Sequence, residues 1–418
     1  MIIHTVMPSD TIYSLSKQYG IPETRIITDN FLDPTQKLVA GQTLIICRPS
    51  KTCSVRGGDT LSSIAKENNI SVLSILQNNP QVRTDKLTPS QTLNLSYDRT
   101  NARSIIVAAY TGDASLQQIE KYLPYISALI VQNAARIDDG TVSMLQNVTP
   151  IVAMAKKYRA LPLLSLDCTN ERGKWNGDCI AKLLDSPVAT ENFIQSAVKT
   201  VKSNGFGGME VSAAGLDTAN GYRFVDMLLA LQGVCSDNEL ICTSPLFPIG
   251  GLDANEENIA DIASLVPLWN YIWDDNTTAA PAAPLDKLQE VFRNNDIISR
   301  YKEKMLLGIP TFGVDYTEMG NGYRKNIINA ADGISLTQKH HIAAEYNENT
   351  HTPFIRYGDN TRKGGERHIV HYEDARSISE KLDLLDTLGL GGVNVMSLEY
   401  DSPVLWQILN QRYSIQKY

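Results

Sequence analysis

A duplicated stretch decides the fold of the N-terminal part of the chain. It reads TVMPSDTIYSLSKQYGIPETRIITDN over residues 5–30 and SVRGGDTLSSIAKENNISVLSILQNN over residues 54–79. A shift of 49 residues superposes residues 4–46 on 53–95 without a gap, and a dozen identical pairs fall in register. Self-similarity of this kind indicates two copies of one module.

Each copy is expected to form a strand, two short helices and a closing strand. In the first copy, Ser9-Asp10-Thr11 supplies N-cap chemistry for a helix that begins at Ile12. Ile12, Leu15 and Tyr19 form an apolar stripe at i, i+3 and i+7, which fits this helix, and the other elements precede or follow it along the chain. They are an entering strand at His4–Val6, a second helix at Glu23–Asp29 and a strand at Leu44–Cys47, with counterparts beginning at Leu61, Val72 and Leu93 in the second copy.

Both copies resemble LysM modules. The resemblance rests on Gly58-Asp59-Thr60-Leu61, Asn78-Asn79 and Gln91-Thr92-Leu93. It implies binding of an N-acetylglucosamine polymer, peptidoglycan or chitin, in a shallow groove between the first helix start and the loop before the last strand. An alternative is that Asp10 and Asp59 only cap helices. The implied groove residues are Ser9, Asp10, Thr11, Asn30 and Phe31 in one module, and Asp59, Thr60, Asn78, Asn79 and Pro80 in the other.

Beyond a polar hinge at 98–102, apolar runs typical of buried strands alternate with helical patterns. Eight such strands predict an α/β fold, a TIM (β/α)8 barrel over 103–418, preceded by modules at 1–49 and 50–98. A polar segment at about 316–372 predicts a small α+β insertion between strands 7 and 8. The expected strands are Ile105–Ala109, Leu129–Gln132, Pro162–Leu166, Gly208–Ser212, Ile241–Ser244, Leu268–Tyr271, Leu306–Ile309 and Val393–Met396.

The barrel segment resembles glycoside hydrolase family 18, and within it the spore cortex-lytic N-acetylglucosaminidases, which also carry two N-terminal LysM modules. The stretches that carry this resemblance are Gly308–Tyr316, Thr352–Tyr357, Tyr372–Ser377 and Leu388–Val393. The resemblance implies a reaction in which the sugar's own acetamido oxygen attacks the anomeric carbon. The enzyme then supplies a general acid and a carboxylate that steadies the intermediate.

In the family these groups lie on one strand as D-G-x-D-x-D-x-E, with the acid last. Here Gly207 and Glu210 stand at the first two Asp positions, Ser212 at the orienting Asp and Ala214 at the acid. A methyl group cannot donate a proton. Glu210 lies four residues earlier, roughly 13 Å along an extended strand, so we expect a buried structural acid there.

Two further family positions are changed. The sixth strand keeps Tyr271 of the family's M-x-Y-D-W but has Ile272 in place of Asp, and Met396 stands where the family has the Trp beneath the sugar. Among the remaining carboxylates Asp315 is the best spare acid, because it is expected to follow a strand end directly. The alternative is that the carboxylates after strands 7 and 8 are ordinary solvated rim charges; these are Asp315, Glu318, Glu399 and Asp401.

The composition of the chain limits the classes of partner that it can bind. A net charge of −8 argues against nucleic acid as a partner. The sequence contains no apolar run of 18 residues, so we expect no membrane span. We expect no secretory signal, no cofactor, and no metal site, since the His residues lack ligand spacing. Cys168 and Cys179 flank a loop-like stretch and can form a disulfide, but the absence of an export signal favours free thiols.

Three functions remain open. The first is a glycan-binding protein of the spore or cell envelope with an inactive barrel, which Ala214 favours. The second is an active N-acetylglucosaminidase with a non-standard acid. The third is a scaffold that binds spore coat proteins and no sugar. For a chain with wall-binding modules and no signal peptide, the resemblance to the spore cortex-lytic enzymes implies synthesis in the mother-cell cytoplasm and deposition on the spore coat or cortex.

Overall fold

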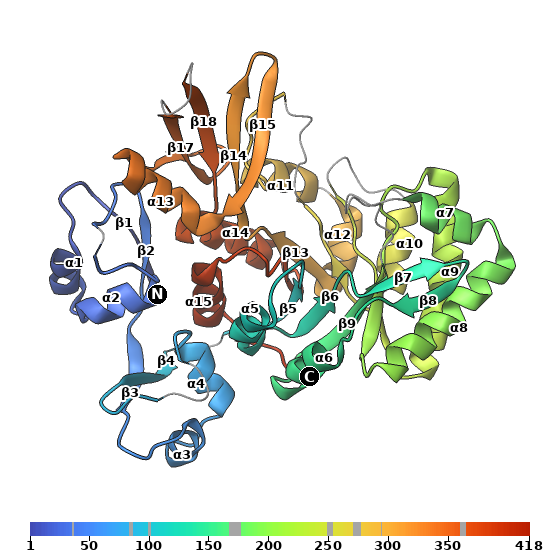
Figure 1. Ribbon diagram of the computed structural model, residues 1–418, viewed down its shortest axis with the longest axis horizontal. Helices are drawn as coiled ribbons and strands as arrows, with labels where there is room; N and C mark the ends of the chain where they lie inside the picture. The colour runs from blue at the N-terminus through green and yellow to red at the C-terminus, as the bar shows by residue number, and fades with distance from the viewer. Residues whose placement is uncertain are drawn as a thin grey trace.

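The computed structural model describes residues 1–35, 37–82, 87–98, 102–166, 177–248, 254–270, 277–293, 295–359 and 365–418. Two small N-terminal modules lie at one side of a large body, and an antiparallel sheet rises from that body beside the first module (Figure 1). Both modules have the expected order of elements. Their bounds are β1 (Ile2–Thr5), α1 (Ile12–Tyr19), α2 (Glu23–Asp29) and β2 (Thr43–Ile46), then β3 (Pro49–Ser54), α3 (Leu61–Glu67), α4 (Val72–Asn78) and β4 (Thr92–Tyr97).

The helix starts in the modules are capped by threonine rather than aspartate. Thr11 and Thr60 each accept a hydrogen bond from the backbone three residues later, and that residue's serine hydroxyl accepts one in return. Such a capping box satisfies two otherwise unpaired N–H groups. Asp10 instead accepts the N–H of Met7 at 2.7 Å, so the expectation that the aspartates cap the helices is corrected by one position.

Eight parallel strands form the body, which is a TIM barrel. Their spatial order is β11-β10-β9-β6-β5-β19-β13-β12, and two isolated parallel bridges, Thr243 to Leu265 and Leu246 to Leu268, join the ends of this path. The strands are β5 (Ser104–Tyr110), β6 (Ala128–Val131), β9 (Leu161–Leu166), β10 (Gly208–Val211), β11 (Ile241–Thr243), β12 (Val266–Pro267), β13 (Met305–Ile309) and β19 (Gly392–Val395).

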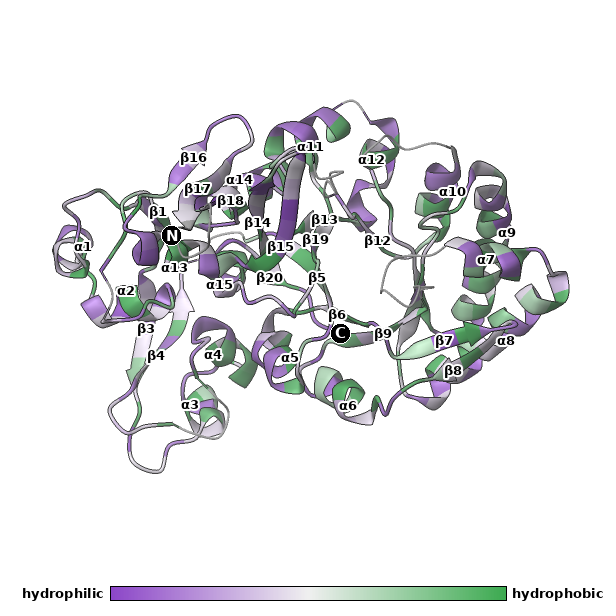
Figure 2. Cartoon of the chain, turned by 45° about the horizontal axis from the view of Figure 1, so that its top comes forward, coloured by the Kyte–Doolittle hydropathy of each residue, from purple (hydrophilic) through white to green (hydrophobic). Residues whose placement is uncertain are grey.

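Helices surround this ring of strands, their hydrophobic sides toward it (Figure 2). Two further features were not expected. A hairpin of β7 and β8 lies between β6 and β9, and β20 (Ser414–Ile415), near the C-terminus, pairs with β5. The bounds are α5 (Leu116–Tyr122), η1 (Leu123–Tyr125), β7 (Ala135–Asp138), β8 (Thr141–Met144), α6 (Thr149–Lys157), α7 (Gly177–Leu184), α8 (Pro187–Ser203), α9 (Thr218–Asp237), α10 (Ala254–Ile262), α11 (Leu285–Phe292), α12 (Asp296–Tyr301), η2 (Lys302–Lys304), α14 (Ala375–Leu388) and α15 (Pro403–Arg412).

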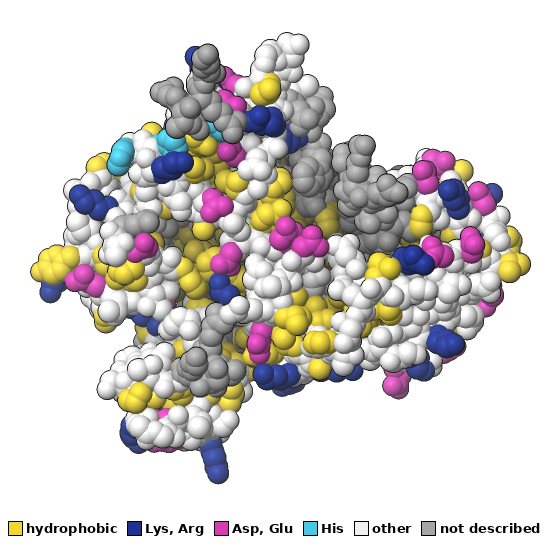
Figure 3. Space-filling model, viewed as in Figure 1, with side chains coloured by type: hydrophobic (Ala, Val, Ile, Leu, Met, Phe, Trp, Pro, Cys, Tyr) yellow, Lys and Arg dark blue, Asp and Glu magenta, His cyan; other side chains and the backbone are white. Residues whose placement is uncertain are grey.

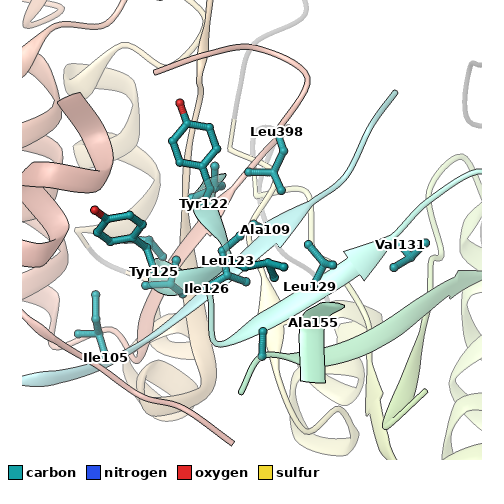
Figure 4. Close-up of a cluster of buried hydrophobic side chains, with 14 of the residues drawn as sticks. Ile105, Ala109, Tyr122, Leu123, Tyr125, Ile126, Leu129, Val131, Ala155 and Leu398 are labelled. Carbon is teal, nitrogen blue, oxygen red and sulfur yellow. The ribbon is translucent and has the colours of Figure 1, made fainter. Parts of the chain in front are cut away.

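The layer between strands and helices is packed with aliphatic and aromatic side chains, part of which Figure 4 shows around Leu123 and Leu129. Trp406 of α15 stacks on Tyr122 at 4.8 Å between ring centroids and is also close to Tyr125. The Tyr125 hydroxyl donates to the carbonyl of Gln77 at 2.8 Å, so this cluster also anchors the second module on the barrel.

The insertion between strands 7 and 8 is a five-stranded antiparallel sheet with one helix. Its order is β15-β14-β18-β17-β16. The insertion begins at Phe312, earlier than the expected residue 316. A separate strand, β14, starts there and runs through the GVDY stretch. The elements are β14 (Phe312–Met319), β15 (Gly322–Asn329), α13 (Ala330–His340), β16 (Glu345–Asn347), β17 (Thr352–Asp359) and β18 (Glu366–His371).

One cysteine differs from expectation. Cys179 of α7 is disulfide-bonded, which contradicts the preference for a free thiol. Cys168, the partner that the sequence offers, lies outside the described residues. The four cysteines at 47, 53, 235 and 242 are free.

Candidate functional site

Ala214, at the position that the family pattern predicts for the acid, lies just beyond β10, at the carboxyl end of the barrel strands. Active sites of TIM barrels lie at this end. Ser212 is buried, and its hydroxyl accepts the backbone N–H of Ala214 at 3.1 Å. The serine therefore holds the turn after the strand, and Ala214, at the expected acid position, carries only a methyl group.

Glu210 is fully buried inside the barrel, and its carboxylate is part of a hydrogen-bonded chain. The Tyr110 hydroxyl donates to Oε2 of Glu210 at 2.6 Å, and Trp269 Nε1 donates to the Tyr110 oxygen at 3.1 Å. The Tyr110 and Trp269 rings pack edge to face at 4.9 Å. Glu210 thus joins β10 to the first and sixth strands. Sequence reasoning expected the buried acid but not its partners, which come from distant strands.

Met396 lies directly after β19 and is buried in the same interior cluster as Tyr110 and Trp269. Its methyl carbon reaches the backbone of Gly308, where a Cβ would lie only 3.1 Å away. The side chain fills space inside the barrel and cannot offer the flat face on which a pyranose packs. Tyr271 and Ile272 lie outside the described residues.

Asp315 is not at a strand end. It lies within β14, where its carboxylate binds His368 Nδ1 at 2.8 Å and accepts the Tyr357 hydroxyl at 3.2 Å. Tyr357 in turn stacks on His340 of α13 at 4.2 Å, so Asp315 faces that helix. Tyr316 points the other way and donates to the carbonyl of Ala280 at 2.7 Å. Because side chains alternate along a strand, Asp315 is turned from the surface that Tyr316 contacts.

Two other carboxylates follow β19. Asp401 pairs with Lys121 at 3.0 Å, and Glu399 is exposed beside Gly112. In the strand order β19 is four places from β10, on the opposite wall of an eight-stranded barrel. Both residues therefore follow a strand on the opposite side of the barrel from Ala214.

The residues expected to line the groove of the first module differ in their exposure to solvent. Ser9 and Thr11 are exposed, and Asp10 binds His4 Nε2 at 2.9 Å in addition to the Met7 amide. Asn30 is buried, and its side chain donates to the carbonyls of Ile26 and Ile45 and accepts the Ile45 N–H at 2.6 Å. This amide ties α2 to β2.

Asn79 repeats that arrangement in the second module. It donates to the carbonyls of Ile75 and Asn94 at 2.8 and 2.7 Å and accepts the Asn94 N–H at 2.8 Å. Asn78 is also buried, donates to the Leu95 carbonyl and accepts the Asn410 amide at 3.1 Å. Thr60 is exposed, while Phe31, Asp59 and Pro80 are half-buried, so the accessible candidates lie in the loops around these amides.

Within the described ranges, no three His, Cys, Asp or Glu side chains are grouped so as to hold a metal ion. In the same part of the chain, no helix combines the length and apolar character that a membrane crossing requires.

Comparison with known proteins gives one family for the barrel and one for the modules. The model of glycosyl hydrolases family 18 matches residues 106–401, and that of the LysM domain matches 4–46 and 53–96. A cortical fragment-lytic enzyme of Bacillus cereus is 24% identical over 444 residues and 99% of each chain. The crystal structure of the Bacillus megaterium spore cortex-lytic enzyme SleL has a TM-score of 0.80 at 24% identity, over 100% of this chain and 99% of that one. A chitinase structure from Chromobacterium violaceum has a TM-score of 0.64 at 20% identity, over 73% of this chain and 98% of that one. At these identities the structures establish the shared fold alone.

Proposed function

The chain belongs to glycosyl hydrolases family 18 and carries two LysM domains, and on this premise we propose that it binds peptidoglycan without hydrolysing it. The observation that carries the proposal is the turn after β10. Ala214 occupies the acid position, and the Ser212 hydroxyl at the orienting position accepts the Ala214 N–H. Without a proton donor at the glycosidic oxygen, leaving-group departure loses general acid catalysis, which contributes about 10²–10⁴-fold in rate.

The modules supply binding in this proposal. Their accessible groove candidates are Ser9, Asp10, Thr11 and Phe31 in the first module, and Asp59, Thr60 and Pro80 in the second. Hydroxyl and carboxylate groups on these loops match the hydroxyl and acetamido groups of the glycan. Two modules on one strand raise avidity if both engage it. We place the protein at the spore cortex, the layer that appears in the relatives' names. Spore coat proteins are further proposed partners.

The second candidate is an active N-acetylglucosaminidase that cleaves cortex or cell-wall peptidoglycan. The family itself and the names of the relatives, cortical fragment-lytic and cortex-lytic enzymes, favour this candidate over an inactive barrel. It requires an acid other than position 214. Of the described carboxylates, Glu210 is held inside the barrel by Tyr110, and Asp315 is held by His368.

One incubation separates the two candidates. The purified chain is mixed with cortex peptidoglycan and centrifuged, and protein in the pellet is measured alongside reducing ends in the supernatant. We expect pelleting with reducing ends at the level of the buffer blank. Pelleting with reducing ends that rise in proportion to protein concentration would establish the hydrolase. If the protein stays in the supernatant, it does not bind peptidoglycan.

A further inference from the structure

A cavity of about 260 Å³ lies where the first module meets the body of the molecule. Its walls come from the loop after α2 and from β2, from α13 of the insertion, and from the starts of α14 and α15. On the face drawn in Figure 3, hydrophobic side chains gather in this junction, with acidic groups beside them. Four separate parts of the sequence therefore enclose one space.

Hydrogen bonds around this space hold the first module in place. The Ala344 N–H donates to the Ala40 carbonyl at 3.0 Å, and the Ala375 N–H donates to the Thr43 hydroxyl at 3.1 Å. Gln338 of α13 donates to the Lys37 carbonyl at 3.1 Å. These contacts keep the cavity walls at a fixed separation, as a preformed ligand site requires.

The lining is partly apolar and close to neutral. Lys37 and Asp33 contribute opposite charges at the exposed rim. Glu373 is neutralised by Lys381 at 2.8 Å, with both side chains buried. Asp374 caps α14 by accepting the Ser377 N–H at 2.9 Å, and burial raises its pKa. The site is therefore unsuited to a strongly charged ligand.

The lining also includes buried polar side chains that suit a hydrogen-bonding ligand. Tyr372 lines the cavity, is 3% exposed, and its hydroxyl has no hydrogen-bond partner among the described residues. A buried hydroxyl without a partner is unfavourable by about 1–3 kcal/mol. Gln42 and Ser402 add further buried polar side chains to the wall, alongside the apolar Leu44 and Ala330.

We propose that this junction cavity is an additional glycan subsite that takes one neutral N-acetylated pyranose. A pyranose offers apolar C–H faces together with hydroxyl and acetamido groups, which matches a near-neutral lining of aliphatic, amide and hydroxyl side chains. The volume is slightly below the about 300–1,000 Å³ of pockets for larger organic ligands, so it suits a single sugar ring. This inference rests on the proposed glycan binding.

The cavity borders the loop that carries two of the groove candidates of the first module. Asn30 and Phe31, two of the groove candidates, line it, whereas Ser9, Asp10 and Thr11 do not. Phe31 has a left-handed backbone conformation (φ 53°), which turns the chain sharply at this point. A glycan that follows the loop at 30–33 is thereby led from the module to the body, so one strand can contact both.

The test fills the cavity from its exposed edge. Ala331 and Ser335 are exposed residues of α13 on the cavity rim, and Lys339 lies on the same helix but outside the lining. Isothermal titration with the N-acetylglucosamine tetrasaccharide compares Ala331→Trp, Ser335→Trp and the control Lys339→Trp with the wild-type chain. We expect both rim variants to lose about tenfold in affinity, or 1.4 kcal/mol, and the control to match wild type.

Pelleting with peptidoglycan separates this inference from the function on which it rests. Rim variants that pellet and bind the tetrasaccharide like wild type would overturn the subsite while glycan binding stands. A wild-type chain that neither pellets nor binds the tetrasaccharide would overturn both. Equal losses in all three tryptophan variants would also overturn the subsite, because the effect would then not depend on the cavity. Unchanged thermal unfolding of the variants excludes misfolding as the cause.

Discussion

At the scale of single residues, buried asparagines hold the modules together. Asn79 is 0% exposed and makes three hydrogen bonds to backbone groups, and Asn30 makes the equivalent set in the other copy. Asn79→Ala should destabilise the second module by about 2–3 kcal/mol, because it leaves a buried N–H and two carbonyls without that partner. Hydrogen exchange of β4 amides in the full chain measures this. Asn68→Ala, which removes one bond to Ile64 O, is the control and should have less effect. Equal protection in both variants would contradict the structural role.

We expect the stability of the first module to depend on pH through Asp29. Burial raises its pKa to about 6, against the opposing effect of Arg25 at 2.7 Å. The unfolded carboxyl titrates near 4, so the native state binds the proton more tightly between about pH 4 and 6. Stability from this group is therefore present in acid and lost as pH rises through 6.

Asp29→Asn removes that dependence. Its stability relative to wild type should rise from pH 4 to pH 6 and then stay constant, by at most about 3 kcal/mol. Hydrogen exchange of first-module peptides over this pH series is the measurement. Glu23→Gln, an exposed carboxyl on the same helix, is the control and should show little change with pH. A flat difference for Asp29→Asn would show that Arg25 compensates the burial fully.

At the scale of elements, Glu210 links β10 across the barrel interior to side chains from two other strands. Tyr110→Phe removes the hydroxyl that donates to Glu210 and accepts from Trp269. We expect about 1–3 kcal/mol of lost stability, since two buried polar groups lose a partner. A thermal scan should show a midpoint lower by about 2–4 °C for each kcal/mol. Tyr222→Phe, an exposed tyrosine on α9, should leave the midpoint unchanged. An unchanged midpoint in Tyr110→Phe would mean that these buried hydrogen bonds do not stabilise the barrel.

The elements also show what sequence could and could not reveal. The duplicated modules and the barrel strands were predictable because apolar periodicity and capping residues are local signals. The position of Asp315 was not, because whether β14 starts before or after GVDY depends on pairing with β15 and β18, which are distant in sequence. For the same reason the partners of Glu210 and the junction cavity were missed. The interpretation of Ala214 as the acid position depended on comparison with the family's sequence pattern.

At the scale of the whole molecule, the first module is docked against the insertion with little room. A methyl group at Gly41 (φ 84°) would overlap the carbonyl of Ala344, whereas at Gly58 (φ 88°) nothing lies within 4 Å. Both substitutions strain the left-handed backbone, but only Gly41→Ala also meets the neighbouring element. We expect Gly41→Ala alone to detach the module, seen as a larger radius of gyration in solution scattering and faster exchange in 342–347. Identical behaviour of the two variants would mean that the docking tolerates separation.

If the turn after β10 does not support hydrolysis, the chain should release no new fragments from peptidoglycan, and analysis of the soluble products measures this. Purified cortex peptidoglycan is incubated for a long period with the wild-type chain, and soluble fragments are identified by liquid chromatography and mass spectrometry. We predict the fragment pattern of the buffer blank, while the same samples show protein bound to the glycan. New fragments that end in N-acetylglucosamine, formed by wild type and lost in Glu399→Gln or Glu210→Gln, would contradict the claim and identify the acid that replaces position 214.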